Sequence, residues 1–211
     1  MCSKPLDAPM PVVLCVLAAG LSRRMGAVNK LLLDYSGQPL VRHVVQQAVE
    51  AAVGKVHVVT GYQAGDVRRA LDGLPVHYVH NPDYEEGLAS SVRQAASIND
   101  SAALMVLLGD MPGVTAPVIR RLVQALRQSA GQKDVSHRVV RPVHEGRPGN
   151  PVLWGTGWLP RLRQLTGDEG ARTLLAGYTG PVLEVEARSR GIFADVDDPS
   201  DLPGFGMHLP G

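Results

Sequence analysis

The sequence has few cysteines and no long apolar segment. Cys2 and Cys15 are the only cysteines among 211 residues, too few for a disulfide framework and typical of a reducing compartment. Nowhere do about 18 apolar residues run together, and residues 1–11 carry one lysine and no apolar targeting segment. These absences predict a cytoplasmic protein that makes no use of a membrane.

The sequence also lacks an excess of charge of either sign. Its 21 lysines and arginines are nearly balanced by 20 aspartates and glutamates, so no overall basic field attracts nucleic acid or an anionic membrane surface. Nucleic acid is therefore not an expected partner. A binding site for a polyanion would have to be a local cluster of cations.

Several well-known catalytic signatures are missing. None of the seven histidines stands at a zinc-binding spacing from a cysteine or another histidine, and there is no Gly-x-Ser-x-Gly elbow. The phosphate-binding pattern Gly-x-x-x-x-Gly-Lys-Ser/Thr and the closely spaced glycines of the dinucleotide fingerprint are absent as well. These gaps argue against a zinc hydrolase, a serine hydrolase and a nicotinamide-dependent oxidoreductase.

What the sequence does contain is an informative segment at residues 12–30. Residues 12–17 form an apolar run that predicts a strand buried on both faces. The small residues 18–20 follow, and they allow backbone N–H groups to approach a ligand closely. Arg24 and Lys30 add positive charge suited to phosphate oxygens. The segment therefore indicates an anion site, with an ordinary basic surface loop as the alternative.

Strand-like and helix-like patterns alternate along the first part of the chain. Such alternation predicts an α/β fold, namely a single-domain, Rossmann-like and mostly parallel sheet with helices on both faces. The loops that follow the strands then share the carboxyl edge of the sheet, where ligands bind. The predicted strands are 12–17, 56–60, 76–79 and 103–108, and the predicted helices are 40–52, 64–71, 88–97 and 117–128.

Two acidic segments could bind a metal ion. Asp110 follows an apolar strand, and a carboxylate in that place suits a hard cation such as Mg²⁺. Asp195 or Asp197 would complete the metal site if the segment after residues 191–194 returns to the same sheet edge. The alternatives are a helix cap or turn for Asp110 and an aspartate-proline turn for the later segment.

Three further features could contact the organic parts of ligands. Ser90 and Ser91 stand at the start of a predicted helix, where they either cap the helix or bind the edge of a nucleobase. Two later loops each carry one arginine, Arg147 and Arg172, which would suit a phosphate monoester and would equally fit ordinary turns.

The pattern loosens from Ser129 onward. Short strands are predicted at 139–143, 152–154 and 182–185, helices near 158–165 and 171–175, and a frayed tail from Pro203. We expect a single domain over residues 1–211. Within it, approximately residues 11–128 would form the ligand-binding core. Approximately residues 129–211 would cover the substrate and supply the second metal ligand.

These motifs together resemble the nucleotidyltransferases of the MobA/MocA and sugar-nucleotide pyrophosphorylase group. Residues 17–30 resemble the nucleotide loop of that family, residues 109–112 its metal motif, and residues 195–199 its closing Asp-Ile-Asp-Thr-Pro. The resemblance covers most of the chain and implies a nucleotide-diphospho-sugar transferase-like fold. Within the group, residues 29–33, 81–87, 149–151 and 167–172 are most similar to the molybdenum cofactor cytidylyltransferases.

The resemblance also implies roles for individual residues. The catalytic residues would be Lys30, Arg24 and Asp110. Mg²⁺ would be held by Asp110 and Asp195, the nucleotide would be bound by Leu17, Ala18, Ala19, Gly20, Arg24, Lys30, Ser91 and Asp110, and the acceptor would be bound by Arg147, Asn150 and Arg172. Arg23, the third cation of the loop, is expected to face solvent or to pack. Where this chain has residues 148–151, Pro-Gly-Asn-Pro, many relatives read Arg-Gly-His-Pro.

The implied reaction joins CMP from CTP to the phosphate of a molybdopterin-type cofactor and releases pyrophosphate. CTP is implied over GTP because residues 17–20 read Leu-Ala-Ala-Gly, whereas the related guanylyltransferases usually read Leu-Ala-Gly-Gly. A phosphate monoester is already an anion at neutral pH, so no general base is expected. A molybdoenzyme or its maturation chaperone would receive the product. The alternatives are transfer to a sugar phosphate or another small phosphate, and a non-catalytic cofactor-delivery module.

Overall fold

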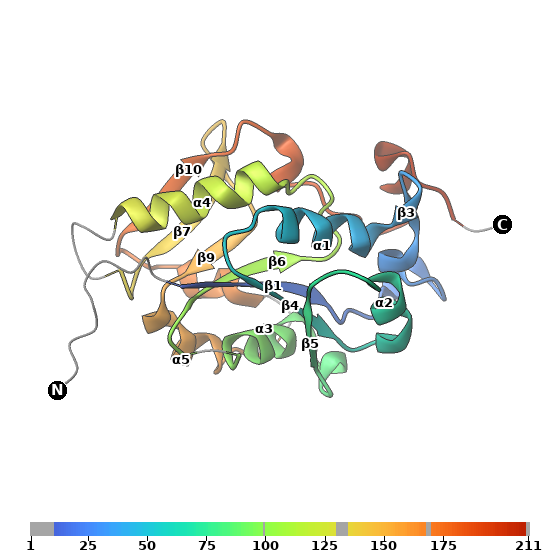
Figure 1. The fold of residues 1–211 in the computed structure, drawn as a ribbon, viewed down its shortest axis with the longest axis horizontal. Coiled ribbons are helices and arrows are strands. Elements are labelled where there is room, and N and C mark those ends of the chain that lie inside the picture. Colours follow the sequence, from blue (N-terminus) through green and yellow to red (C-terminus); the bar gives the residue numbers. More distant parts are fainter. Residues whose placement is uncertain (1–10, 99, 130–134, 168–169, 210–211) are drawn as a thin grey trace.

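The protein is built on one eight-stranded sheet (Figure 1). The computed structural model describes residues 11–98, 100–129, 135–167 and 170–209. The strands of this sheet are β1 (Val12–Ala18), β4 (Lys55–Thr60), β5 (His77–His80), β6 (Ala103–Leu108), β7 (Val139–His144), β8 (Arg147–Pro148), β9 (Val152–Trp154) and β10 (Val182–Glu186). Two further strands, β2 (Asp34–Tyr35) and β3 (Gln38–Pro39), form a separate small hairpin.

The sheet is mostly parallel, as the sequence predicted. Its strands lie in the order β10-β7-β9-β6-β1-β4-β5, with β8 paired to β7. Strand β1 pairs in parallel with β4 and β6, whereas β9 runs antiparallel to its neighbours β6 and β7. All seven residues of β1 are buried, because this central strand is covered by helices on both faces.

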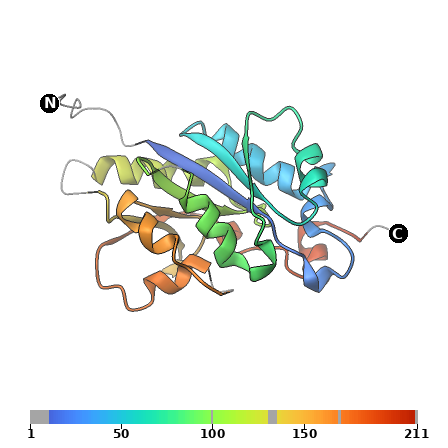
Figure 2. The ribbon, with the colours of Figure 1, turned by 90° about the horizontal axis from the view of Figure 1, so that it is seen from below.

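The helices cover both faces of the sheet (Figures 1 and 2). They are α1 (Leu40–Glu50), α2 (Ala64–Ala70), α3 (Leu88–Ala96), α4 (Ala116–Ser129) and α5 (Leu159–Leu162). The apolar sides of α1, α2 and α4 pack into one core cluster, and those of α3 and α5 pack into another on the opposite face. Among the residues that the structure describes, no helix has the length and apolar character needed to cross a membrane.

The later part of the chain departs from the sequence predictions in three places. The helices predicted near 158–165 and 171–175 are a one-turn α5 preceded by a 3₁₀ turn at Thr156–Trp158, and a 3₁₀ segment at Gly170–Leu175. The predicted fraying from Pro203 is wrong for the described residues. A 3₁₀ turn at Leu202–Phe205 packs there, because Leu202 and Met207 are buried in a small apolar cluster with Met25.

Backbone hydrogen bonds join the loops at the carboxyl edge of the sheet. The N–H of Gly109 donates to the carbonyl of Leu17 at 3.0 Å, and the N–H of Val196 donates to the carbonyl of Asp110 at 3.0 Å. The second bond brings the segment of Asp195 and Asp197 back beside the end of β6. The carboxyl edge therefore gathers the segments that the sequence singled out.

Candidate active site

A pocket of about 440 Å³ lies at this carboxyl edge. Its wall includes the end of β1, the loop that follows it, the start of α3 and the loop after β6. Of the residues predicted to bind nucleotide or metal, those that line it are Leu17, Ala19, Gly20, Arg24, Lys30, Ser91, Asp110 and Asp195. Ala18 is not among the lining residues, because its side chain packs into the core on the other face of the sheet.

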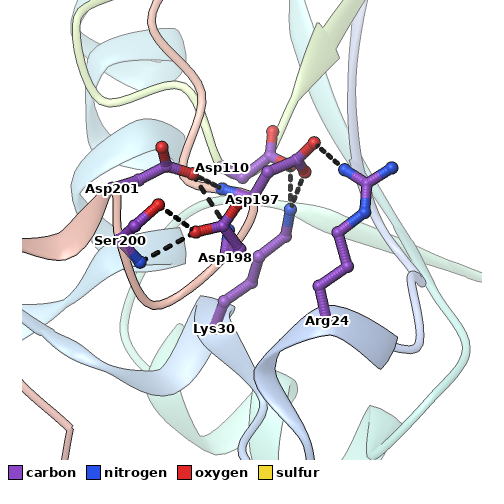
Figure 3. Close-up of polar contacts among 7 residues, drawn as sticks. All are labelled: Arg24, Lys30, Asp110, Asp197, Asp198, Ser200 and Asp201. Carbon is purple, nitrogen blue, oxygen red and sulfur yellow. Dashed lines mark hydrogen bonds and ion pairs between the residues drawn. The ribbon is translucent and has the colours of Figure 1, made fainter.

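Two cations and two carboxylates form an ion-pair network in this pocket (Figure 3). The Lys30 Nζ atom lies 2.7 Å from Asp110 Oδ2 and 2.8 Å from Asp197 Oδ1. Arg24 Nη1 lies 2.6 Å from the other oxygen of Asp197. The side chain of Lys30 is 12% exposed and that of Arg24 is 70% exposed. Lys30 is thus held deep in the site, while Arg24 reaches in from the surface.

The titration behaviour of these groups follows from the network. Burial alone would lower the pKa of Lys30, but the carboxylates of Asp110 and Asp197 raise this pKa above its ordinary value. The hydrogen bond from Lys30 and the nearby charge of Arg24 lower the pKa of Asp197. Lys30 and Asp197 are therefore both charged at neutral pH.

Asp195 lines the same pocket as Asp110 and differs from Asp197 in its surroundings. Burial, followed by the negative charge of Asp110, raises the pKa of Asp195 above its ordinary value. The Asp110 Oδ1 atom is buried and has no hydrogen-bond partner among the described residues. Two neighbouring carboxylates, one with an unpaired buried oxygen, fit a divalent cation, because Mg²⁺ is commonly bound by one or two carboxylates together with phosphate oxygens and water.

The segment that carries Asp197 is fixed by a tight turn. The backbone N–H groups of Asp197 and Asp198 both donate to Asp201 Oδ2, at 2.8 and 2.9 Å. The N–H of Ser200 donates to Asp198 Oδ1 at 2.8 Å (Figure 3). The aspartate-proline turn that the sequence offered as an alternative is therefore present, and it leaves the side chains of Asp195 and Asp197 facing the pocket.

The loop between β1 and α1 is held in place by its own polar groups. The backbone N–H of Lys30 donates to the Ser22 hydroxyl at 3.2 Å, and Asn29 Oδ1 accepts from the N–H of Leu31 at 3.1 Å. Gly20 is exposed, and a Cβ atom added there would meet open space. The backbone at Gly20 is thus accessible from the pocket. Arg23 is exposed and also lines the pocket.

The two serines of α3 have different surroundings. The Asn81 side-chain amide donates to Ser90 Oγ at 2.8 Å and to Ser91 Oγ at 3.1 Å, and the Ser90 hydroxyl donates to the carbonyl of Gly87. Only Ser91 of this pair is among the residues that line the pocket. Asn81 was not singled out from the sequence, because a buried asparagine after a strand has no distinguishing pattern.

A second pocket, of about 670 Å³, adjoins the first. The two share Leu17, Leu88, Leu108 and Asp195 in their walls. The three residues predicted to bind the acceptor, Arg147, Asn150 and Arg172, all line the second pocket. Residues 168 and 169 of the loop before Arg172 lie outside the described residues.

The second pocket also contains residues that the sequence did not indicate. Arg141 of β7 lines it and donates from Nε and Nη2 to Glu184 Oε1, at 3.1 and 2.6 Å. Phe193 lines it too, and the guanidinium of Arg147 lies 4.5 Å from the centre of its ring. An arginine inside a strand and one of two phenylalanines in a loop give no recognisable signal until the fold places them together.

Two pockets adjoin at the carboxyl edge of a mostly parallel sheet. One has a glycine-containing loop, a largely buried lysine and an exposed arginine, and the other has several arginines. This arrangement suits the joining of a nucleotide to a second anionic substrate. The class of the chain is accordingly nucleotidyltransferase. The chain belongs to the family described as the MobA-like NTP transferase domain, whose model matches residues 14–183.

Two of the similar proteins are named as nucleotidyltransferases, in agreement with this assignment. The molybdenum cofactor cytidylyltransferase of Escherichia coli is 28% identical over 195 residues, which cover 92% of this chain and 95% of that protein. A nucleotidyl transferase from Methanothermobacter is 25% identical, with a TM-score of 0.76 over 92% of this chain and 94% of its own. The Rv0371c protein of Mycobacterium tuberculosis, solved in complex with manganese, is 25% identical, with a TM-score of 0.74 over 94% of this chain and 98% of its own. These structures confirm the predicted nucleotide-diphospho-sugar transferase-like fold.

Proposed function

We propose that the protein transfers CMP from CTP to the phosphate of a molybdopterin-type cofactor in a Mg²⁺-dependent reaction that releases pyrophosphate. The observation that carries the proposal is the junction of the two pockets at Asp195. Cations suited to a triphosphate lie on one side of this carboxylate, and arginines suited to a phosphate monoester lie on the other. The Escherichia coli cytidylyltransferase supports the choice of substrates, because its similarity extends over both pockets.

The first pocket would bind the nucleotide. The backbone of residues 17–20 would seat the nucleoside, Ser91 would face the base, and Lys30 and Arg24 would hold the triphosphate. Both cations are paired with Asp197. Binding of the triphosphate would therefore exchange one anionic partner for another. Lys30, which is already largely buried, would not need to be desolvated anew.

Asp110 and Asp195 would hold the metal ion. The unpaired buried oxygen of Asp110 and the proximity of the two carboxylates support this pair. Asp197 is engaged by Lys30 and Arg24, which favours Asp195 as the second ligand. A bound divalent cation would neutralise charge on the α-phosphate and on the carboxylates around it.

The second pocket would bind the acceptor through Arg147, Asn150 and Arg172. This assignment would divide the single domain of residues 1–211 into two parts. Approximately residues 11–128 would supply the proposed nucleotide contacts, and approximately residues 129–211 would supply the proposed acceptor contacts and the second metal ligand, Asp195. β7, β9 and β10 belong to the same sheet as β1. A shared sheet would fix the distance between the two substrates.

The chemistry would be a displacement at phosphorus. An oxygen of the acceptor phosphate forms a bond to the α-phosphorus of CTP, the bond from that phosphorus to the bridging oxygen of the β-phosphate breaks, and its electron pair leaves with pyrophosphate. Lys30 and Arg24 would stabilise the charge that develops on the leaving group. The acceptor oxygen is already anionic at neutral pH, so the protein would contribute position and positive charge.

Pyrophosphate release with each of the four common nucleoside triphosphates tests the proposal. The assay is run in Mg²⁺ with molybdopterin cofactor, with a sugar phosphate and without acceptor. We expect turnover that requires the cofactor and is fastest with CTP. Equal turnover with a sugar phosphate would contradict the proposed acceptor, and binding of CTP and cofactor without pyrophosphate release would indicate a delivery module.

A further inference from the structure

Two arginines of the second pocket differ in what holds their side chains. Arg141 donates two of its N–H groups to Glu184. The side chain of Arg147 makes no hydrogen bond or ion pair with any residue that the structure describes. Its guanidinium lies instead 4.5 Å from the centre of the Phe193 ring. The N–H groups of Arg147 are therefore available to a ligand in the pocket.

An aromatic ring can hold an arginine without using its hydrogen-bond donors. The attraction acts between the positive charge and the electrons of the ring. Arg147 is exposed, and ordering a free arginine side chain on binding costs conformational entropy. Phe193 is half-buried and packs against the larger core cluster, so its ring has a firm support. The ring thus orders the guanidinium before a ligand arrives.

The backbone on both sides of this contact is also held. Arg147 follows the turn residues Glu145 and Gly146, whose φ angles are 52° and 76°, as in the tight turns that join antiparallel strands. After β8, the N–H of Asn150 donates to the carbonyl of Ile192 at 3.0 Å. Ile192 directly precedes Phe193. The hairpin that carries the arginine is therefore joined to the segment that carries the ring.

The contact lies close to the junction of the two pockets. Phe193 precedes Asp195 by two residues, and two residues span at most roughly 7 Å. Asp195 lines both pockets, and Arg147 and Phe193 line the second one. An anion held by Arg147 would therefore lie near the segment at which the pockets meet. The acceptor phosphate would have to reach the nucleotide at this place.

We propose that Phe193 is a positioning residue, whose ring holds the guanidinium of Arg147 toward the anionic end of the acceptor, a phosphate monoester. The identity of the acceptor rests on the proposed function. In the nucleotide pocket, Lys30 and Arg24 are paired with Asp197, so a phosphate there must replace a carboxylate. Arg147 has no such competitor, because a ring takes the place of the carboxylate.

The order of the Arg147 side chain tests this proposal directly. Phe193→Leu removes the ring and keeps an apolar side chain against the core, and Phe193→Tyr keeps the ring. The Nε–H signal of Arg147 is assigned in ¹⁵N spectra by its absence in Arg147→Lys, and its relaxation reports mobility. We expect an ordered signal in wild type and Phe193→Tyr and a mobile one in Phe193→Leu. Inorganic phosphate should shift the wild-type signal, with a Kd about fivefold higher in Phe193→Leu.

Kinetics with the molybdopterin acceptor give a second measurement. We expect Phe193→Leu to raise the acceptor KM about fivefold and to leave the KM for CTP unchanged. In an Arg147→Ala background, Phe193→Leu should have no further effect. The matched control is Tyr78→Leu, because Tyr78 packs against the same core cluster and has the guanidinium of Arg68 5.2 Å from its ring centre. Neither residue of that pair lines the two pockets, so both KM values should stay unchanged.

The outcomes separate this inference from the proposed function. An Arg147 signal that is as ordered in Phe193→Leu as in wild type would overturn the inference, as would a wild-type signal that responds to neither phosphate nor acceptor. An effect of Phe193→Leu that persists in Arg147→Ala would also overturn it, because the ring would then contact the acceptor itself. If wild type releases no pyrophosphate with any nucleotide, the proposed function is wrong, and the phosphate titration still tests Phe193.

Discussion

Lys30 is the residue on which the charge balance of the site depends. Its ammonium group is largely buried between Asp110 and Asp197. Removing one partner of such an ion pair lowers stability by more than the intact pair adds, because the remaining charge is left buried without a partner. Asp110 is consequently both a partner of Lys30 and the proposed metal ligand. Its side chain is 18% exposed, so it is less accessible than an ordinary loop carboxylate.

The substitution Asp110→Asn tests this double role. We expect kcat to fall by at least about 100-fold, because the variant loses the charge proposed to hold the metal ion. Lys30 keeps Asp197 as a partner, so the melting temperature should change by no more than about 4 °C. The measurements are pyrophosphate release and thermal unfolding.

Asp66→Asn is the control for this substitution, because Asp66 forms an exposed ion pair with Arg69 on α2. This substitution also removes one carboxylate charge, but at a position outside the pocket, so kcat should stay unchanged. Full activity of Asp110→Asn would exclude Asp110 as a metal ligand. A drop in melting temperature as large as that of a core cavity would give Asp110 a structural role instead.

At the residue scale, the sequence was enough to select four charged residues that the fold brings to one pocket, but it did not show which residues they contact. Arg24, Lys30, Asp110 and Asp195 were identifiable because charged residues after apolar strands form a local pattern. The ion pairs of Asp197 with Lys30 and Arg24 join residues 167 and 173 positions apart, and no local pattern reports a contact of that separation. The same holds for Asn81, whose hydrogen bonds to Ser90 and Ser91 form only once the fold buries it.

At the scale of elements, close packing of two loops positions the acidic residues. A Cβ atom on Gly191 would lie 2.5 Å from the carbonyl oxygen of Gly113, and one on Gly113 would lie 2.4 Å from the Cα atom of Gly191. Gly113 follows Asp110 by three residues, and Gly191 precedes Asp195 by four. The contact of these glycines and the bond from Val196 to the carbonyl of Asp110 hold the two segments together.

The substitution Gly191→Ala should therefore force the two loops apart. We expect a loss of about 1–3 kcal/mol in the free energy of unfolding, together with a fall in kcat, since Asp195 would move away from Asp110. Urea unfolding and pyrophosphate release give the two values. Gly204→Ala is the control, because a Cβ atom there meets open space. Wild-type kcat in a destabilised Gly191→Ala would show that the contact serves stability alone.

Elements in the first part of the chain were predictable because their patterns are strong and regular. Helix α1 was expected at 40–52 and is found at Leu40–Glu50, and the strand expected at 103–108 is β6. The later elements are short, and their type depends on what they pack against. The loop before β9 also depends on a distant segment. Its Asn150 N–H donates to the carbonyl of Ile192, which lies more than forty residues later in the sequence.

At the scale of the whole molecule, one sheet carries both proposed substrates. Strands β1 and β6 end at the nucleotide pocket, and β7 and β9 form part of the adjoining pocket. The alternation of strands and helices was enough to predict the mostly parallel sheet and to direct attention to the edge at which the nucleotide pocket is proposed. The insertion of the antiparallel strand β9 between β6 and β7 was not predictable, because a three-residue apolar segment fits several places in a sheet.

Identification of the product is the most direct test of the central claim that the two pockets join CMP to a molybdopterin phosphate. Wild-type protein is incubated with Mg²⁺, the acceptor and CTP labelled on the α-phosphate, and the product is analysed by mass spectrometry together with released pyrophosphate. We expect one α-labelled CMP on each acceptor molecule and one pyrophosphate for each product. Transfer of the γ-phosphate, or hydrolysis of CTP with unmodified acceptor, would contradict the account.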